Sequence, residues 1–529
     1  MQFNLGKIGV SFVIKSPFLY TNMVRSSKIE SFSKTPQFWS GKSEKGDEIL
    51  QGIFDWAGSK EIDLENPWDE EADCSYSWQE YAHSFEWLYD VRTSTISNGQ
   101  VKACEWLRAW IKKYEKPSSL IWRSDIVARR LTSLLSNYDY LIANADKKLS
   151  DSLNDSLSRH IGHLIFTNGY DCKLVAQRLS ALRGLIIGLL ATNNTTLDIK
   201  LLINDFCQIL EDNLHPDGMN KMRSIPVQIS FAKDAFMVQS MLHKMAMNVP
   251  NVMDNAIIKM LSALKVFVYQ DGSFAHFAGA SDSVYYVRQI FARYAKKYDV
   301  PNQLEDAGFY NALVGKTQVL FDAGNRSNTS YDDAGILSFE MNYNKTRIFV
   351  NCGYCPNSDN PLYEACKNTS AHNSITVDNY NAMSIGNQSR ITSVTGSMIT
   401  EEGWTLLQGS HDGFKTVCNS VLKRAIAINE DGTEIKGEDK FEQIDGIRQI
   451  VSRFHLHPNV KVWLLSSKRE AMLQVGKTGW KFKVSGGEIA IEESFYMDIN
   501  GSRRKTNQIV LRTSSIAQHI VMRWNLSLQ

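Results

Sequence analysis

Side chains that could do chemistry gather in one stretch of the chain, between Asn351 and Asn373. An apolar run ends at Asn351, a loop with three cysteines follows, and the pair His372-Asn373 precedes the alternating run SITVD. Alternation of apolar and polar residues predicts a half-buried strand. A histidine and an amide at the start of a strand are held by a rigid sheet, so this stretch is the first candidate for proton transfer or hydrogen bonding to a ligand.

The same region offers mixed nitrogen and oxygen ligands. Asp333 precedes the run GILSFEM, Asn351 ends the next run, and His372 opens a third. Such a set can bind a divalent metal ion. Hydrogen-bonded turn residues are the alternative interpretation, and the sequence favours it. Cys352 and Cys355 form the chain's one CxxC pair, so a four-thiolate zinc site is not predicted, and we expect reduced structural cysteines.

A turn between two helical patterns holds an amide and a guanidinium. The segment HPDGMNKMRSIP contains Asn220 and Arg223, three residues apart. If it is helical, both side chains lie on one face. Together they would bind a carboxylate, because Arg offers two parallel donors. A capped helix start with a solvated Arg223 is the alternative.

Further along, the turn YQDGSFAHF places Tyr269 and His276 where either could transfer a proton. A core aromatic and a loop histidine are the alternative. His411, in the segment HDG, adds an imidazole that could contact a ligand.

Aromatic residues are dense between 66 and 92. Core packing explains most of them, but the indoles of Trp68, Trp78 and Trp87 could also form a platform for stacking sugars. His83 lies among them, and a lone histidine of this kind is more often structural.

The patterns around these residues predict an α-helical part followed by a β part. From about 100 to 300, apolar residues recur with helical spacing over several turns, with short polar connectors, which indicates an α-solenoid or an α/α toroid. After about 305, short β-branched and aromatic runs alternate with Gly, Asn and Asp turns, as in an antiparallel sandwich. We therefore predict two domains, 1–305 and 306–529.

Composition excludes several classes of protein. The 529 residues carry 58 basic and 57 acidic side chains, so no general attraction to nucleic acid is expected. No apolar run reaches the roughly 20 residues that cross a bilayer. The first 20 residues lack the layout of a cleavable signal. P-loop, GxGxxG, GxSxG and HExxH motifs are absent in a usable context.

Several motifs resemble the heparinase II/III family of polysaccharide lyases, and more closely its alphaproteobacterial branch. They cover most of the chain: PDGxNxxR, the LSFEM and VNCG runs, AHNSITVD, HSFEWLYD, WRSDIVARRL, GSHDGF and FHLHP. The resemblance implies an incomplete α/α toroid followed by an antiparallel β-sandwich. It also implies β-elimination from a uronic-acid-containing glycan, in which a carboxylate is neutralised, a C5 proton is removed and the leaving O4 is protonated.

The resemblance also suggests roles for individual residues. Asn220 and Arg223 would neutralise the carboxylate, Tyr269 would be the general acid and serve as base, and His372 or His276 would assist. His83, Trp87, His276 and His411 are expected to contact substrate. No cofactor is required. Any zinc ion would be structural and would involve Asp333, Asn351 and His372, although Asp333 and Asn351 depart from the family's usual metal ligands.

Other functions stay open. The first alternative is a non-catalytic protein that binds an acidic glycan or helps to process cell-envelope polysaccharide. The second is a hydrolase, which needs two facing carboxylates that the turns above do not offer. The sequence identifies neither the glycan that the protein would bind nor whether the chain forms a homodimer. The unpaired cysteines and the missing signal favour the cytoplasm, whereas the family resemblance implies the periplasm.

Overall fold

The structure is a computed structural model. It describes residues 35–56, 59–61, 64–68, 74–114, 116–117, 120–280, 284–294, 298–326, 333–355, 360–383, 393–498, 502–514 and 519–529. The N-terminal stretch on which the signal prediction depends lies outside these residues.

The chain divides into two compact units. The first comprises residues 1–212, 230–257 and 286–293, and the second comprises 213–229, 258–285 and 294–529. Segments 213–229 and 258–285, which carry Asn220, Tyr269 and His276, therefore belong to the same unit as His372. The two units thus interleave along the chain, whereas the change from helices to strands falls between Tyr294 and Gln303. The division into domains 1–305 and 306–529 stays a prediction.

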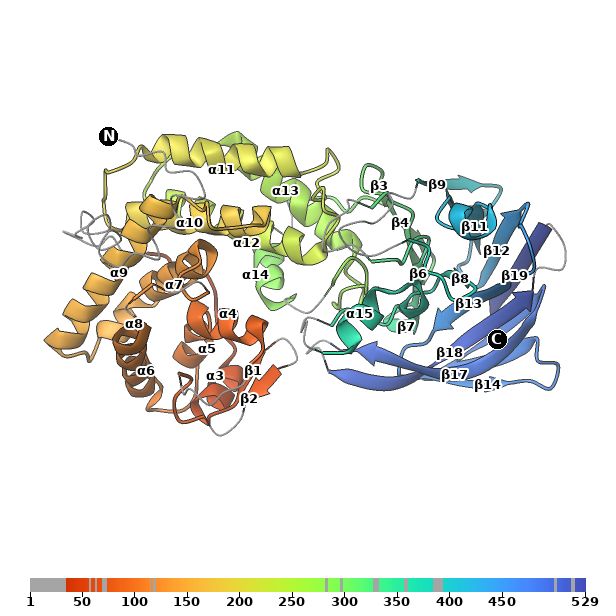
Figure 1. The fold of residues 1–529 in the computed structure, drawn as a ribbon, viewed down its shortest axis with the longest axis horizontal. Coiled ribbons are helices and arrows are strands. Elements are labelled where there is room, and N and C mark those ends of the chain that lie inside the picture. Colours follow the sequence, from red (N-terminus) through yellow and green to blue (C-terminus); the bar gives the residue numbers. More distant parts are fainter. Residues whose placement is uncertain are drawn as a thin grey trace. The chain divides into compact units, whose positions relative to one another are not determined.

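The first unit is helical (Figure 1). Its helices begin and end as their sequences indicate. Asp146 caps α9 by accepting a 2.7 Å hydrogen bond from the Leu149 N–H. The predicted helical run 124–142 is two helices, since Asn137 has ψ near 13° and interrupts it. The elements are α3 (Ser43–Leu50), β1 (Phe54–Trp56), β2 (Ser59–Glu61), α4 (Tyr76–Ser84), α5 (Leu88–Arg92), α6 (Gly99–Tyr114), α7 (Ser124–Ser136), α8 (Tyr138–Ile142), α9 (Lys147–Thr167), α10 (Val175–Ala191) and α11 (Ile199–Asn213).

Three helices have residues in both units: α12 (Ile225–Lys244), α13 (Asn251–Val266) and α14 (Val284–Tyr294). No helix among the described residues is both long enough and apolar enough to cross a membrane.

The second unit is built from three antiparallel sheets. Their orders are β14-β15-β16-β19-β12-β11-β10-β9, β17-β18-β13-β8 and β3-β4-β5-β6-β7. The strands are β3 (Gln303–Leu304), β4 (Phe309–Val314), β5 (Thr317–Asp322), β6 (Phe339–Tyr343), β7 (Thr346–Phe349), β8 (Ile375–Val377), β9 (Val394–Glu401), β10 (Trp404–His411), β11 (Leu422–Asn429), β12 (Glu434–Glu442), β13 (Gln449–His455), β14 (Val460–Leu464), β15 (Glu470–Val475), β16 (Thr478–Ser485), β17 (Glu488–Met497), β18 (Arg503–Ser514) and β19 (His519–Leu528). Short helices α15 (Leu362–Lys367), η1 (Thr369–Ala371) and α16 (Lys415–Cys418) lie in the connections.

One aromatic cluster joins the three sheets. The ring of Phe339 in β6 lies 5.5 Å from Trp524 in β19, and Trp524 lies 5.4 Å from Phe454 in β13. Rings at these separations pack face to face or edge to face. Each sheet therefore places an apolar face in a shared core, as in a sandwich. The predicted order of a helical region followed by antiparallel sheets is confirmed.

Candidate active site

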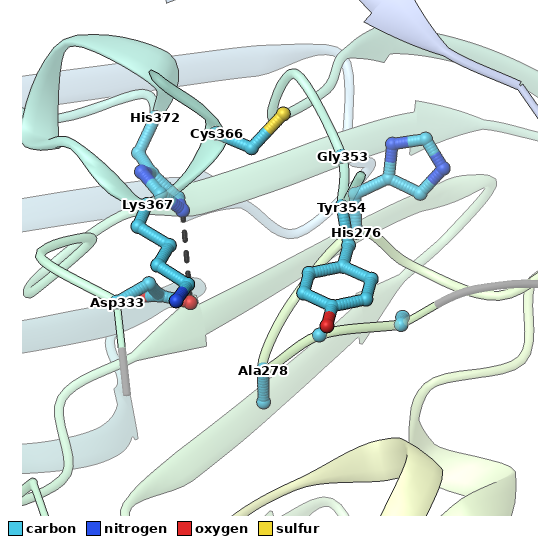
Figure 2. Close-up of a pocket in the computed structure, with 10 residues that line it drawn as sticks. His276, Ala278, Asp333, Gly353, Tyr354, Cys366, Lys367 and His372 are labelled. Carbon is cyan, nitrogen blue, oxygen red and sulfur yellow. Dashed lines mark ion pairs between the residues drawn. The ribbon is translucent and has the colours of Figure 1, made fainter. Parts of the chain in front are cut away.

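A small cavity of about 20 Å³ in the second unit brings together titratable side chains from three separate segments (Figure 2). We call it the His372 pocket. The side chains with polar or titratable atoms that line it are His276, Asp333, Tyr354, Cys366, Lys367 and His372.

His372 and Asp333 form the polar wall of the pocket. The Nε2 atom of His372 lies 3.7 Å from Asp333 Oδ2, and its Nδ1–H donates to the Asn368 carbonyl at 2.8 Å. Burial lowers the pKa of His372, but the Asp333 carboxylate outweighs burial and raises it above its ordinary value. Reciprocally, burial raises the pKa of Asp333, whereas His372 and Arg326 together hold it well below the usual range. The pairing therefore favours an imidazolium beside a carboxylate.

His276 contributes a neutral imidazole. Its Nδ1 lies 3.3 Å from the Asn351 carbonyl, an acceptor, so Nδ1 carries the proton and the lone pair is on Nε2. Burial and the nearby Arg347 lower the pKa of His276 to about 3. The ring also stacks on Tyr496, with the centroids 4.7 Å apart.

A glycine makes room for this ring. Gly353 has φ of +92°, and a Cβ atom there would lie 2.8 Å from His276 Nδ1. Any other residue would meet both a disfavoured backbone conformation and the imidazole.

Tyr354 and Lys367 complete the pocket, and the sequence interpretation missed both. Tyr354 follows Gly353 in the loop after β7, and Lys367 ends α15 with its ammonium 3.9 Å from the centre of the Tyr363 ring. Their position beside the VNCG and AHN segments is the only signal in the sequence, because their loops are shaped by contacts with distant residues.

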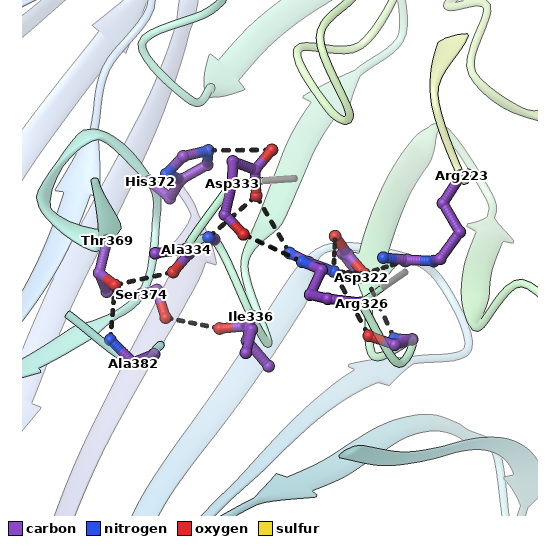
Figure 3. A network of polar contacts seen from close by, with 12 residues as sticks. Arg223, Asp322, Arg326, Asp333, Ala334, Ile336, Thr369, His372, Ser374 and Ala382 are labelled. Atoms are coloured by element: carbon purple, nitrogen blue, oxygen red, sulfur yellow. Dashed lines mark hydrogen bonds and ion pairs between the residues drawn. The ribbon is translucent and has the colours of Figure 1, made fainter. Parts of the chain in front are cut away.

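A buried chain of alternating charges leads from Arg223 to His372 (Figure 3). Arg223 Nη2 pairs with Asp322 at 2.5 Å, and Arg326 Nη1 lies 3.0 Å from the same carboxylate. Arg326 Nη2 then reaches Asp333 Oδ1 at 3.1 Å. Arg223 also donates to the Ala307 carbonyl at 2.6 Å. Burial lowers the pKa of Arg223. Its guanidinium is thus held inside the unit and stabilises the wall that carries Asp333.

The segment that holds Asn220 and Arg223 is a tight turn, and the helix considered from the sequence does not form there. Leu214 and Asn220 make an isolated β-bridge, and Arg223 has a left-handed φ of +53°. The Asn220 amide donates to Ser224 O at 2.7 Å and to Gln228 Oε1 at 2.9 Å, while its oxygen accepts from Ser224 N at 3.1 Å. Neither Asn220 nor Arg223 lines the His372 pocket.

Tyr269 is also held internally. Its hydroxyl donates a 2.6 Å hydrogen bond to Glu340, a fully buried carboxylate in β6. Glu340 accepts further bonds from the backbone N–H groups of His276 at 3.1 Å and Asn351 at 2.7 Å. Burial and Glu340 raise the pKa of Tyr269 well above its ordinary value. Tyr269 is not among the residues that line the pocket.

The remaining predicted contact residues lie inside their units. Trp87, in the first unit, is fully buried and donates through its indole to Ala82 O at 3.0 Å. His83, in the same unit, accepts a 3.0 Å bond from Trp110 and stacks on Trp68. His411, in the second unit, is buried against Phe414.

The residues proposed as metal ligands are not arranged to bind a metal ion. The Asn351 amide donates to His276 O and its oxygen accepts from Asn373 N, so both ends are used by the backbone. Arg326 and the Gly335 N–H already occupy Asp333 Oδ1. Among the described residues, no three His, Cys, Asp or Glu side chains are grouped to hold a metal. The structure joins none of the eight cysteines in a disulfide.

The chain is similar to known proteins both in sequence and in structure. Residues 300–525 match the model "Heparinase II/III-like, C-terminal". FtsZ-localized protein C from Caulobacter vibrioides is 23% identical over 480 residues, which are 84% of this chain and 81% of that protein. The crystal structure of heparinase III superposes with a TM-score of 0.74 at 12% identity, covering 99% of this chain and 92% of the other. A mutant of the heparan sulfate lyase HepC from Pedobacter heparinus gives 0.64 at 12% identity, with 99% and 88% covered. Residues 300–525 therefore belong to the heparinase II/III-like family as its C-terminal domain, on a chain that has the fold of heparinase III.

Proposed function

We propose that this protein is a polysaccharide lyase that cleaves a uronic-acid-containing glycan by β-elimination at the His372 pocket. The observation that carries the proposal is the pocket itself. It combines two cations, a neutral imidazole and a phenol on a fold shared with heparinase III.

The cations address the first requirement of the reaction. The C5 proton of a uronate is too weakly acidic while the carboxylate next to it bears a full negative charge. The His372 imidazolium and the Lys367 ammonium would bind that carboxylate and stabilise the enolate-like charge that develops on it. Asp333 supports this role, because its carboxylate raises the pKa of His372 and so favours the protonated imidazole.

His276 and Tyr354 address the two proton transfers. The free lone pair on His276 Nε2 can accept the C5 proton. A pKa of about 3 makes this a weak base, but the negative charge of a bound uronate would raise it. Tyr354 would donate its phenolic proton to the leaving O4. The C5–H and C4–O bonds break, a C4–C5 double bond forms, and both protons are accounted for.

These assignments revise the residue roles that the sequence suggested. His372 and His276 keep roles in the reaction. We move the general acid from Tyr269 to Tyr354 and the neutralising cation from Arg223 to Lys367, because Tyr269 and Arg223 are bonded to Glu340 and Asp322. Asn220, bonded to Gln228, becomes a residue that shapes the turn.

A second candidate function is glycan binding without cleavage. The internal hydrogen bonds of Asn220 and Tyr269 favour it, since both were expected to act on substrate. The relative FtsZ-localized protein C is named for its location with FtsZ and not for a lyase activity, which is compatible with this candidate. For this chain we propose the cytoplasm as compartment, because eight cysteines without a disulfide suit a reducing environment; the periplasm is the alternative.

The test is incubation with heparan sulfate, chondroitin, hyaluronan, alginate and bacterial uronic-acid polymers. A lyase produces an unsaturated uronate that absorbs in the ultraviolet, which hydrolysis does not. Product from the wild type that disappears in His276→Gln supports the proposal. Binding by calorimetry without product from any polymer would support the second candidate and contradict the first.

A further inference from the structure

The eight-stranded sheet has a hollowed outer face, away from the His372 pocket residues. One hollow of about 450 Å³ lies over β11, β12, β19 and β16, and another of about 350 Å³ lies over β9 to β12. Both include Ala425 and Glu438, so they form one continuous trough across the sheet. From β9 to β16 there are five strand spacings of about 4.8 Å each, so the trough is roughly 24 Å long.

Small side chains form the floor of the trough. Along β11, Leu422, Ile426 and Ile428 are buried, whereas Ala425 and Ala427 point to the other face. Pairing places Ala425 beside Gln408 and Glu438, and Ala427 beside Lys436. Because alternate residues of a strand share a face, the methyl groups leave a depression between longer side chains on the neighbouring strands.

The exposed charged side chains that line the trough are mainly basic. Five cations contribute, and Glu438 is the one exposed acid among the lining residues. Arg424, which also lines the trough, is neutralised by Asp439 at 2.6 Å beneath the sheet. The five cations are Lys423, Lys436, Lys440, Lys483 and Arg523.

These cations have partners that a ligand can replace. Arg523 pairs with Glu438 at 2.7 Å, Lys440 with Glu442 at 2.8 Å and Lys483 with Glu470 at 3.4 Å. Such exposed pairs contribute only about 0–1 kcal/mol each, so exchanging a carboxylate of the protein for one of a ligand costs little. Lys436 pairs with Glu434 at 3.4 Å and Lys423 with Glu442 at 3.4 Å, so each of the five cations has an exchangeable acidic partner. The Lys436 ammonium also lies 4.4 Å from the Trp404 ring centre.

We propose that this trough binds a linear polyanionic glycan, with uronate or sulfate groups on the cations and sugar rings over the alanine floor. Charge complementarity and the elongated shape select such a chain. The site would hold a long polymer independently of cleavage, and so goes beyond the lyase proposal. A lyase with this surface would bind long chains more tightly than short ones.

The test uses the full chain carrying His276→Gln, so that no substrate is consumed. Affinity for size-fractionated heparan sulfate is measured by calorimetry for this protein and for two triple variants. The trough variant adds Lys436→Glu, Lys483→Glu and Arg523→Glu. The matched control adds Arg503→Glu, Lys505→Glu and Arg512→Glu on β18, where the side chains are similarly exposed and paired. Both triples change the net charge equally.

We expect the trough variant to lose about tenfold in affinity for long chains and to show a weaker dependence on salt. The control should change by less than about threefold. Equal losses in both triples, or no loss in the trough variant, would overturn the proposal. A DNA strand of the same charge is the second ligand. If it binds as tightly as the glycan and loses affinity in the trough variant, the proposal that the occupant is a glycan is wrong. Loss of binding in the trough variant together with no lyase product from the wild type would support the trough and reject the lyase.

Discussion

The Tyr269 hydroxyl donates a 2.6 Å hydrogen bond to the buried carboxylate of Glu340, 71 residues away in the sequence. The same carboxylate accepts the backbone N–H groups of His276 and Asn351. Glu340 thus fastens the turn that carries His276 to the strand next to the pocket. Tyr269 serves this connection, and its phenol is turned to the interior of the unit.

Replacing Tyr269 by Phe should therefore affect stability more than catalysis. Glu340 would lose one of three donors while buried, which costs about 1–3 kcal/mol of unfolding free energy. Urea unfolding and initial rates, measured on the same preparation, check this. A large loss of rate at unchanged stability would instead place the Tyr269 phenol in the reaction.

Asp333→Asn should shift the pH dependence of the rate. Asp333 raises the pKa of His372, so its removal lets His372 lose its proton at lower pH. The alkaline limb of the rate profile should therefore move towards acid. Asp431→Asn, in an exposed turn, is the control. An unmoved limb would show that the charge of His372 does not govern turnover.

Alanine variants of two glycines distinguish the effect of backbone strain from the effect of displacing a pocket residue. Gly353 and Gly476 both have positive φ, but only at Gly353 would a Cβ meet another group, namely His276. Both Ala variants should lose about 1–2 kcal/mol of stability from the left-handed backbone.

Only Gly353→Ala should also lose activity, by about 100-fold, because the imidazole is displaced. Thermal unfolding and initial rates of the two variants provide the comparison. Equal rates in the two would mean that the position of His276 is unimportant.

Part of this arrangement was predictable from the sequence. The change from helical to alternating patterns reflects local periodicity, and in the structure it falls between the end of α14 at Tyr294 and the start of β3 at Gln303. The importance of His372 was also visible, since it stands directly before a strand.

The partners of the site residues were not predictable. Spacing suggested Tyr269 as the acid, but only the folded chain brings Glu340 to its hydroxyl. From the sequence, Arg223 could bind a ligand, but in the structure it pairs with Asp322, which lies 99 residues later in the chain. Tyr354 lies in a loop and Lys367 ends the short helix α15, and the placement of such side chains depends on long-range packing.

Because several histidines are buried, we predict that the free energy of unfolding falls as the pH is lowered. Burial lowers the pKa of His276, His411 and His455 to about 3. Below the ordinary histidine pKa of about 6.5, these imidazoles are protonated in the unfolded chain but stay neutral in the folded protein. The free energy of unfolding therefore falls as the pH falls. His372 acts oppositely: its raised pKa adds stability below about 6.5 that is lost as pH rises through its folded pKa.

His411→Leu isolates one such group. Plots of unfolding free energy against pH should lose up to about 1.4 kcal/mol per pH unit of slope in the acid range, whatever the cost at neutral pH. His519→Leu, at an exposed position, is the control and should leave the slope unchanged. An unchanged slope in His411→Leu would mean that this imidazole titrates normally in the folded protein.

The central claim is that elimination takes place at the His372 pocket with Tyr354 as the acid. The most direct measurement is the initial rate of unsaturated product formation by wild type, Tyr354→Phe and Tyr380→Phe, using the polymer that the wild type cleaves. Tyr380 is an exposed tyrosine outside the pocket. We predict that Tyr354→Phe loses about 100-fold or more in rate, while Tyr380→Phe retains the wild-type rate. A Tyr354→Phe protein that is folded and cleaves at the wild-type rate would contradict the account.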